Sequence, residues 1–87
     1  MKHASHTDIG NRLKRCTGHL QKVIAMLEEG RPCAELAQQL HAVERAITSA
    51  KKVLIQDHID HCLSQPPPDA DAHAATVADL REITRYL

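Results

Sequence analysis

The feature that most constrains the fold is a long stretch, residues 33–65, that contains neither glycine nor proline. Its apolar side chains recur at alternating steps of three and four residues, at Cys33, Leu36, Leu40, Val43, Ile47, Ala50 and Leu54. This spacing predicts one helix of about 30 residues, or about 45 Å at 1.5 Å per residue. Pro32 suits the start of such a helix, and the three prolines at 66–68 end it.

Two shorter amphipathic segments flank the long one. The first carries a stripe of apolar residues at Ile9, Leu13, Cys16, Leu20, Val23 and Leu27, widened by Ile24. Thr7 or Asp8 could cap this helix, and Gly30 could end it. The last segment has its stripe at Thr76 or Val77, Leu80, Ile83 and Leu87. We therefore predict an all-α chain with a medium, a long and a short helix.

The unequal lengths of the predicted helices indicate that the chain forms an oligomer. A single medium helix cannot cover the long one, so we predict an antiparallel dimer that closes a four-helix bundle. The 87 residues suffice for one domain, which we place at 1–87, with a flexible N-terminus at 1–6 and a proline-rich linker at 66–72.

Composition excludes several classes of protein. No segment approaches the roughly 20 apolar residues of a membrane-spanning helix. The first residues lack the apolar region of a secretory signal. Three cysteines are too few for a disulfide scaffold. We therefore expect a cytoplasmic protein whose thiols stay reduced and can bind metal.

His58 and Cys62 are four residues apart, so they lie on one face of the long helix, one turn apart. Cys33 could supply a second thiolate, but it opens the same helix, close to 40 Å away from His58. In an antiparallel dimer, Cys33 of one chain could reach the pair in the other. Two sulfurs and one nitrogen suit Cu(I), and a fourth ligand, from His3 or His6, would suit Ni(II) or Zn(II).

Plainer interpretations exist for each of these residues. An isolated His/Cys pair is more often structural, and Cys33 could be a small buried side chain. We expect Cys16 to lie in the core, His19 and His41 to be exposed or in polar contacts, and His73 to lie in the linker. His61 points away from Cys62. Asp57 or Asp60 could orient His58 by accepting a hydrogen bond.

Positive charge is concentrated in residues 11–22, which include Arg12, Lys14, Arg15 and Lys22 but no acidic residue. Lys52 and its neighbours add charge to the long helix. The formal net charge of the chain is zero, so this split could create a positive face for phosphates, although a solvated helix face explains it equally well.

Three segments together resemble the CsoR/RcnR family of metal-sensing bacterial repressors: "RLKRCTGHLQKVIAMLEEGRPC", "AQQLHAVERAI" and "DHIDHC". With "HASH" included, the pattern is most similar to the nickel-resistance, NreA-type branch. The resemblance implies a helical dimer, paired into a tetramer, that binds operator DNA and releases it when metal binds. It implies metal ligation by Cys33, His58 and Cys62, and DNA contacts by Arg12 and Lys52, to which Arg15 is a plausible addition.

We therefore expect a repressor that releases DNA on binding Cu(I) or Ni(II), with Zn(II) or Co(II) as weaker candidates. His3 is the nearest counterpart of the N-terminal histidine of nickel sensors. Two alternatives are a metal buffer or chaperone without DNA binding, and a repressor of the same family that senses persulfide or formaldehyde through its thiols. No catalytic metal motif such as H-E-x-x-H occurs, so we do not expect an enzyme.

Overall fold

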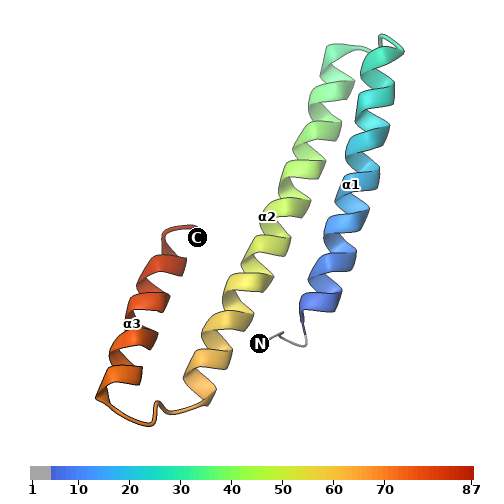
Figure 1. Cartoon of the computed structure of the whole chain (residues 1–87). Coiled ribbons are helices and arrows are strands. Elements are labelled where there is room, and N and C mark those ends of the chain that lie inside the picture. The colour runs from blue at the N-terminus through green and yellow to red at the C-terminus, as the bar shows by residue number, and fades with distance from the viewer. Residues whose placement is uncertain (1–4) are drawn as a thin grey trace.

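The computed structural model describes residues 5–87, and these form three α-helices and no strand. The helices are α1 (His6–Glu28), α2 (Cys33–Ser64) and α3 (Ala70–Thr84). Figure 1 shows α1 and α2 as an antiparallel hairpin, with α3 folded back beside the C-terminal half of α2. The all-α prediction is confirmed. Among the described residues, no helix is both long and apolar enough to cross a membrane.

The long helix α2 is continuous, as the sequence predicted, and ends one residue earlier than expected. Pro32 precedes it, and the Pro32 carbonyl accepts hydrogen bonds from the amides of Glu35 and Leu36, at 3.0 and 3.1 Å. The chain is extended at Gln65, immediately before the three prolines. Both ends are therefore set by proline, which cannot occupy a helix interior.

The turn between α1 and α2 is a Schellman motif. The amide of Gly30 donates to the Leu27 carbonyl and the amide of Arg31 donates to the Met26 carbonyl, each at 3.1 Å. Gly30 has a positive φ of 75°, which a residue with a Cβ adopts only with strain. Gly30 therefore ends α1 in the way that the sequence predicted.

The other helix ends differ from expectation. Ser5, rather than Thr7 or Asp8, occupies the N-cap of α1, and its side chain makes no capping hydrogen bond. Asp69 caps α3 by accepting a hydrogen bond from the Ala72 amide at 2.8 Å. This cap starts α3 inside the stretch expected to be linker, so His73 lies in the helix. Leu87 lies beyond the end of α3.

The core is a thin seam between α1 and α2. Its buried members are Ile9, Cys16, Val23 and Met26 on α1, and Leu36, Val43, Ala50 and Ile55 on α2. The predicted stripes are therefore divided, because only every second member faces the neighbouring helix. Leu20 and Ile47 remain 41% and 46% exposed. The burial of Cys16 agrees with its predicted place in the core.

The chain is much more extended than a compact protein of its size. It measures 59 × 23 × 14 Å, with a radius of gyration of 18.0 Å. A compact domain of this length has a radius of gyration of about 12 Å. No residue of α3 is buried. The isolated chain therefore has a hairpin seam in place of a central core.

Candidate metal centre and basic groove

His58 and Cys62 come together near the C-terminal end of α2. Their side chains are one helical turn apart, and the Cys62 sulfur lies 3.6 Å from Nε2 of His58. Metal bonds of about 2.3 Å to sulfur and about 2.05 Å to nitrogen, at a tetrahedral angle, also place the two atoms about 3.6 Å apart. Both residues are partly buried. The pair therefore fits two adjacent ligands of one ion without rearrangement.

Cys33 lies at the opposite end of the same helix. It is the first residue of α2, and its side chain is exposed. Because α2 is unbroken, the 25 residues from Cys33 to His58 place the two about 38 Å apart along the helix axis. The fold thus keeps Cys33 away from His58 and Cys62 of its own chain.

The third ligand-type group beside the pair is Asp79 of α3. Its carboxylate oxygen Oδ2 contacts Nε2 of His58, and the donor atoms of His58, Cys62 and Asp79 all lie within 4.8 Å of one another. Asp79 was not predicted, because among the carboxylates only those of the long helix are close to His58 in the sequence. A signal was available: Asp79 follows Thr76 by three residues and precedes Ile83 by four, so it belongs to the face that α3 turns towards α2.

Other predicted ligands and partners have different positions. Asp57 and Asp60 were considered as carboxylates that could orient His58, and a carboxylate of α3 also contacts it. His3 lies outside the described residues. His6 is the first residue of α1. His19 forms a polar contact, because its Nε2 lies 2.7 Å from Oε1 of Gln39 and links α1 to α2.

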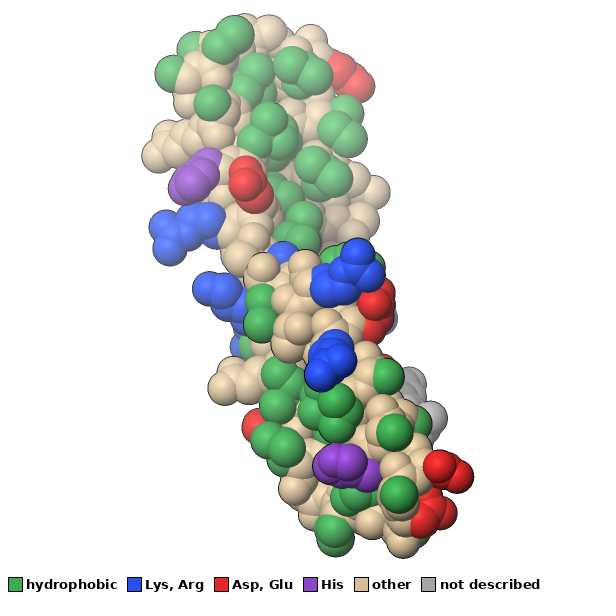
Figure 2. Space-filling model, turned by 90° about the vertical axis from the view of Figure 1, so that its left-hand side faces the viewer, with side chains coloured by type: hydrophobic (Ala, Val, Ile, Leu, Met, Phe, Trp, Pro, Cys, Tyr) green, Lys and Arg blue, Asp and Glu red, His purple; other side chains and the backbone are tan. Residues whose placement is uncertain are grey.

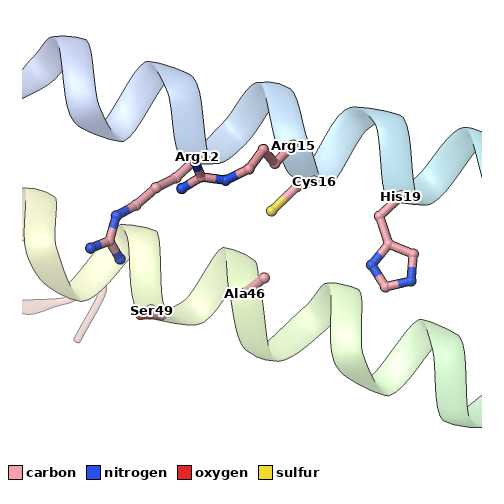
Figure 3. Close-up of a pocket in the computed structure, with 6 residues that line it drawn as sticks. All are labelled: Arg12, Arg15, Cys16, His19, Ala46 and Ser49. Carbon is pink, nitrogen blue, oxygen red and sulfur yellow. The ribbon is translucent and has the colours of Figure 1, made fainter.

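A groove of about 260 Å³ runs between α1 and α2. It is lined by Arg12, Arg15, Cys16, His19, Ala46 and Ser49. Figure 3 shows the side chains of Arg12 and His19 reaching from α1 towards α2, with the Cys16 sulfur pointing into the space between the helices. Arg12 also pairs with Asp8, from Nε to Oδ2 at 3.2 Å, whereas Arg15 is exposed. Both predicted DNA-contacting residues of α1 therefore lie at one groove.

Lys52 lines an adjoining groove with Glu44, Arg45, Thr48 and Ser49. Ser49 lines both grooves, so the basic residues of α1 and α2 share one region of the surface, which we call the basic groove. Figure 2 shows Lys and Arg side chains gathered about the middle of the molecule, with apolar side chains over the hairpin above. The structure thus brings Arg12, Arg15 and Lys52 into one region, as a phosphate-binding surface would require.

A family model and several known proteins match this chain. The family model described as "Metal-sensitive transcriptional repressor" matches residues 5–87. The copper-sensing transcriptional repressor CsoR of Mycobacterium ulcerans (strain Agy99) is 37% identical over 65 residues, which cover 75% of this chain and 56% of the relative.

CsoR of Mycobacterium tuberculosis (strain ATCC 25618 / H37Rv) is 34% identical over 76 residues, covering 87% of this chain and 63% of the relative. CsoR of Bacillus subtilis (strain 168) is 31% identical over 75 residues, covering 86% and 73%. The matches thus span less than two thirds of the length of these mycobacterial relatives.

Proposed function

Because the chain belongs to the family of metal-sensitive transcriptional repressors, we propose that it is a repressor that binds operator DNA without metal and releases it on binding Cu(I) between two subunits. Ni(II) is the second candidate inducer. The observation that carries the proposal is the His58–Cys62 pair, with 3.6 Å between Nε2 and sulfur, on an unbroken helix that begins with Cys33. The copper-sensing function of the relatives favours Cu(I).

The length of α2 supports a site that is shared between two subunits. An ion cannot bridge the roughly 38 Å that separate Cys33 from His58 within one straight helix. Two α2 helices packed antiparallel would place the start of each beside the end of the other. Each dimer would then hold two equivalent sites, with Cys33 from one chain and His58 and Cys62 from its partner.

The exposed apolar residues support such a dimer. The hairpin leaves a row of half-exposed side chains, which we call the outer stripe: Leu13, Leu20, Ile24 and Leu27 on α1, and Leu40, Ile47 and Leu54 on α2. The chain exposes 6670 Å². A compact monomer of 9.7 kDa exposes about 5,100 Å². The excess is within the range of about 1,000–2,500 Å² that one partner buries in an obligate homodimer, and the heptad spacing of the outer stripe suits a four-helix bundle.

The basic groove supports DNA binding in the same assembly. Arg12, Arg15 and Lys52 would contact phosphates, and a dimer or tetramer would repeat the groove along the duplex. Such contacts fix the protein on DNA without a helix-turn-helix. They respond to the shape of the DNA grooves. A metal ion would link the start of α2 in one subunit to the end of α2 in the other. This link would change the spacing between the basic grooves of the two subunits. This is how we propose that metal binding weakens DNA binding.

Two soft thiolates and one imidazole form a trigonal donor set that favours Cu(I) over harder ions. By thermodynamic linkage, DNA must weaken metal binding by the same factor by which metal weakens DNA binding, typically about 1–3 kcal/mol. Removing one thiolate should therefore reduce both metal affinity and the response of DNA binding to metal.

Anaerobic fluorescence anisotropy on the DNA upstream of its own gene tests the proposal. We expect the apo protein to bind this DNA, and stoichiometric Cu(I) or Ni(II) to release it, whereas Cys33→Ala should bind DNA but not respond. A wild-type chain that never binds the DNA would favour the metal buffer. A chain that binds DNA and responds to neither metal would favour thiol sensing through Cys33 and Cys62.

A further inference from the structure

We propose that the basic groove binds a small disulfide that carries carboxylate groups, and that Cys16 forms a mixed disulfide with it there. The adduct would weaken DNA binding without any metal. The site is separate from the proposed metal centre, because it uses neither Cys33 nor Cys62. The reaction at Cys16 is independent of the proposed function, whereas its effect on DNA rests on that function.

Cys16 lies at the floor of a cavity in the hairpin. Arg12, Cys16 and His19 follow one another at steps of four and three residues, so they lie on one face of α1. The Cys16 side chain is only 9% exposed, but its sulfur points into the part of the basic groove that measures about 260 Å³. No group within residues 5–87 forms a hydrogen bond to this free thiol. The sulfur therefore faces a space that can hold a small molecule.

The charges around this space favour an anion. Of the six residues that line it, two carry guanidinium groups, one carries an imidazole, and none carries a carboxylate. Arg12 pairs with Asp8 at 3.2 Å, but both side chains are largely exposed, so the pair is weak. Guanidinium groups bind carboxylates well and attract anions from a distance. Cys62, by contrast, lies beside the carboxylate of Asp79. An anionic disulfide should therefore react preferentially at Cys16.

The reaction is thiol–disulfide exchange, which needs no other oxidant. The Cys16 thiol loses its proton to solvent, and the thiolate attacks one sulfur of the small disulfide. A bond forms between the Cys16 sulfur and that half of the molecule while the original S–S bond breaks. The other half leaves as a thiolate and takes up a proton. One disulfide is exchanged for another, so an excess of the reduced small thiol reverses the reaction.

The adduct would act on DNA binding through its charge. A carboxylate attached to Cys16 would lie between α1 and α2, where it can pair with Arg12 and Arg15. These are the arginines that the proposed function assigns to DNA phosphates. The adduct would therefore compete with the phosphates for the same guanidinium groups. Bound DNA should in turn cover the groove and slow the reaction at Cys16.

The first test compares two reagents on the metal-free full chain with Cys33→Ser and Cys62→Ser, in which Cys16 is the remaining thiol. Dithiodipropionate transfers a two-carbon arm that ends in a carboxylate, and cystamine transfers a similar arm that ends in an ammonium group. Intact mass spectrometry gives the two rates. We expect dithiodipropionate to react at least about 10-fold faster in about 0.01 M salt. In about 1 M salt, where the screening length is about 3 Å, most of this preference should disappear.

Arg12→Gln and Arg15→Gln, introduced together into the same chain, should reduce the preference to about 2-fold or less. Equal rates for the two reagents in the unmutated groove would overturn the inference. So would a folded chain that does not react although the unfolded chain does. Both outcomes concern the groove alone and leave the proposed function standing.

The second test measures DNA binding of the two adducts by fluorescence anisotropy. We expect the carboxylate adduct to weaken binding by at least about 10-fold, and the ammonium adduct to change it by less than about 3-fold. A chain that also carries Cys16→Ser, treated in the same way, should not change, and excess thiol should restore binding to the carboxylate adduct. Equal losses for both adducts would mean that bulk alone disturbs the groove, which would overturn the proposed role of charge. An unmodified wild-type chain that never binds DNA would count against the proposed function, while the rates would still decide whether the groove binds the disulfide.

Discussion

Complementation between two variants that each lack a metal-binding thiolate tests the proposed sharing of the metal site between subunits most directly. Cys33→Ala and Cys62→Ala each remove one thiolate from every site of a homodimer. When the two variants are unfolded, mixed in equal amounts and refolded together, half of the dimers should contain one chain of each kind. In such a dimer, Cys33 of the second variant meets His58 and Cys62 of the first. One of its two sites is intact, and the other has lost both thiolates.

The structure sets the size of the expected effect. If all ligands came from one chain, mixing could restore nothing, and the roughly 38 Å between Cys33 and His58 along α2 excludes such a site. Random pairing therefore gives about 0.25 tight sites per chain in the mixture, compared with about one per chain in wild-type protein. A tetramer made of two such dimers gives the same ratio.

Anaerobic Cu(I) titration against a competing chelator measures these sites. Each variant refolded alone should show no tight binding, and the mixture should show about a quarter of the wild-type stoichiometry. The cross-subunit reasoning is refuted if the mixture binds no more than its components although mass spectrometry of the intact complexes shows mixed dimers. It is equally refuted if either variant alone retains full tight binding.

Three further predictions concern the dimer, the basic groove and the helix turn. Ile47→Asp should raise the dissociation constant of the dimer by at least about 100-fold in analytical ultracentrifugation, because burial of such a side chain contributes about 1.5–3 kcal/mol per chain. The control Thr48→Asp should leave this dissociation constant unchanged. An Ile47→Asp chain that dimerises as tightly as wild type would contradict the proposed dimer interface. Arg15→Gln should weaken DNA binding and lower the slope of log K against log salt by about one per bound chain; an unchanged slope would remove Arg15 from the interface. Gly30→Ala should lower the free energy of unfolding by about 1–2 kcal/mol because of its positive φ, while Gly18→Ala should raise it by about 0.5–1 kcal/mol in chemical denaturation. Equal effects of the two glycine variants would contradict this account of the turn.

The candidate site was only partly predictable. The His58–Cys62 pair could be identified because residues four apart on a helix must lie on one face, whatever surrounds the helix. Asp79 is 21 residues from His58, on another helix. The two meet because of the path of the chain between α2 and α3 and the start of α3 at Ala70, which is earlier than the sequence predicted.

The apolar stripes of α1 and α2 were also only partly predictable. Periodicity correctly assigned the apolar residues of α1 and α2 to one broad face of each helix. It could not determine which members face the neighbouring helix, because a heptad stripe offers two adjacent seams. Packing of the hairpin selected Val23 and Val43 for the core and left Leu20 and Ile47 exposed.

The sequence by itself determined the three helices, the turn at Gly30, and the positions of His58, Cys62 and Cys33 along one long helix. All of these follow from local backbone preferences and the helical repeat. Only the tertiary structure decided which apolar side chains remain exposed, that Arg12, Arg15 and Lys52 lie in one basic region, and that Asp79 reaches His58. These depend on how helices pack against one another, since packing brings together side chains that are distant in the sequence.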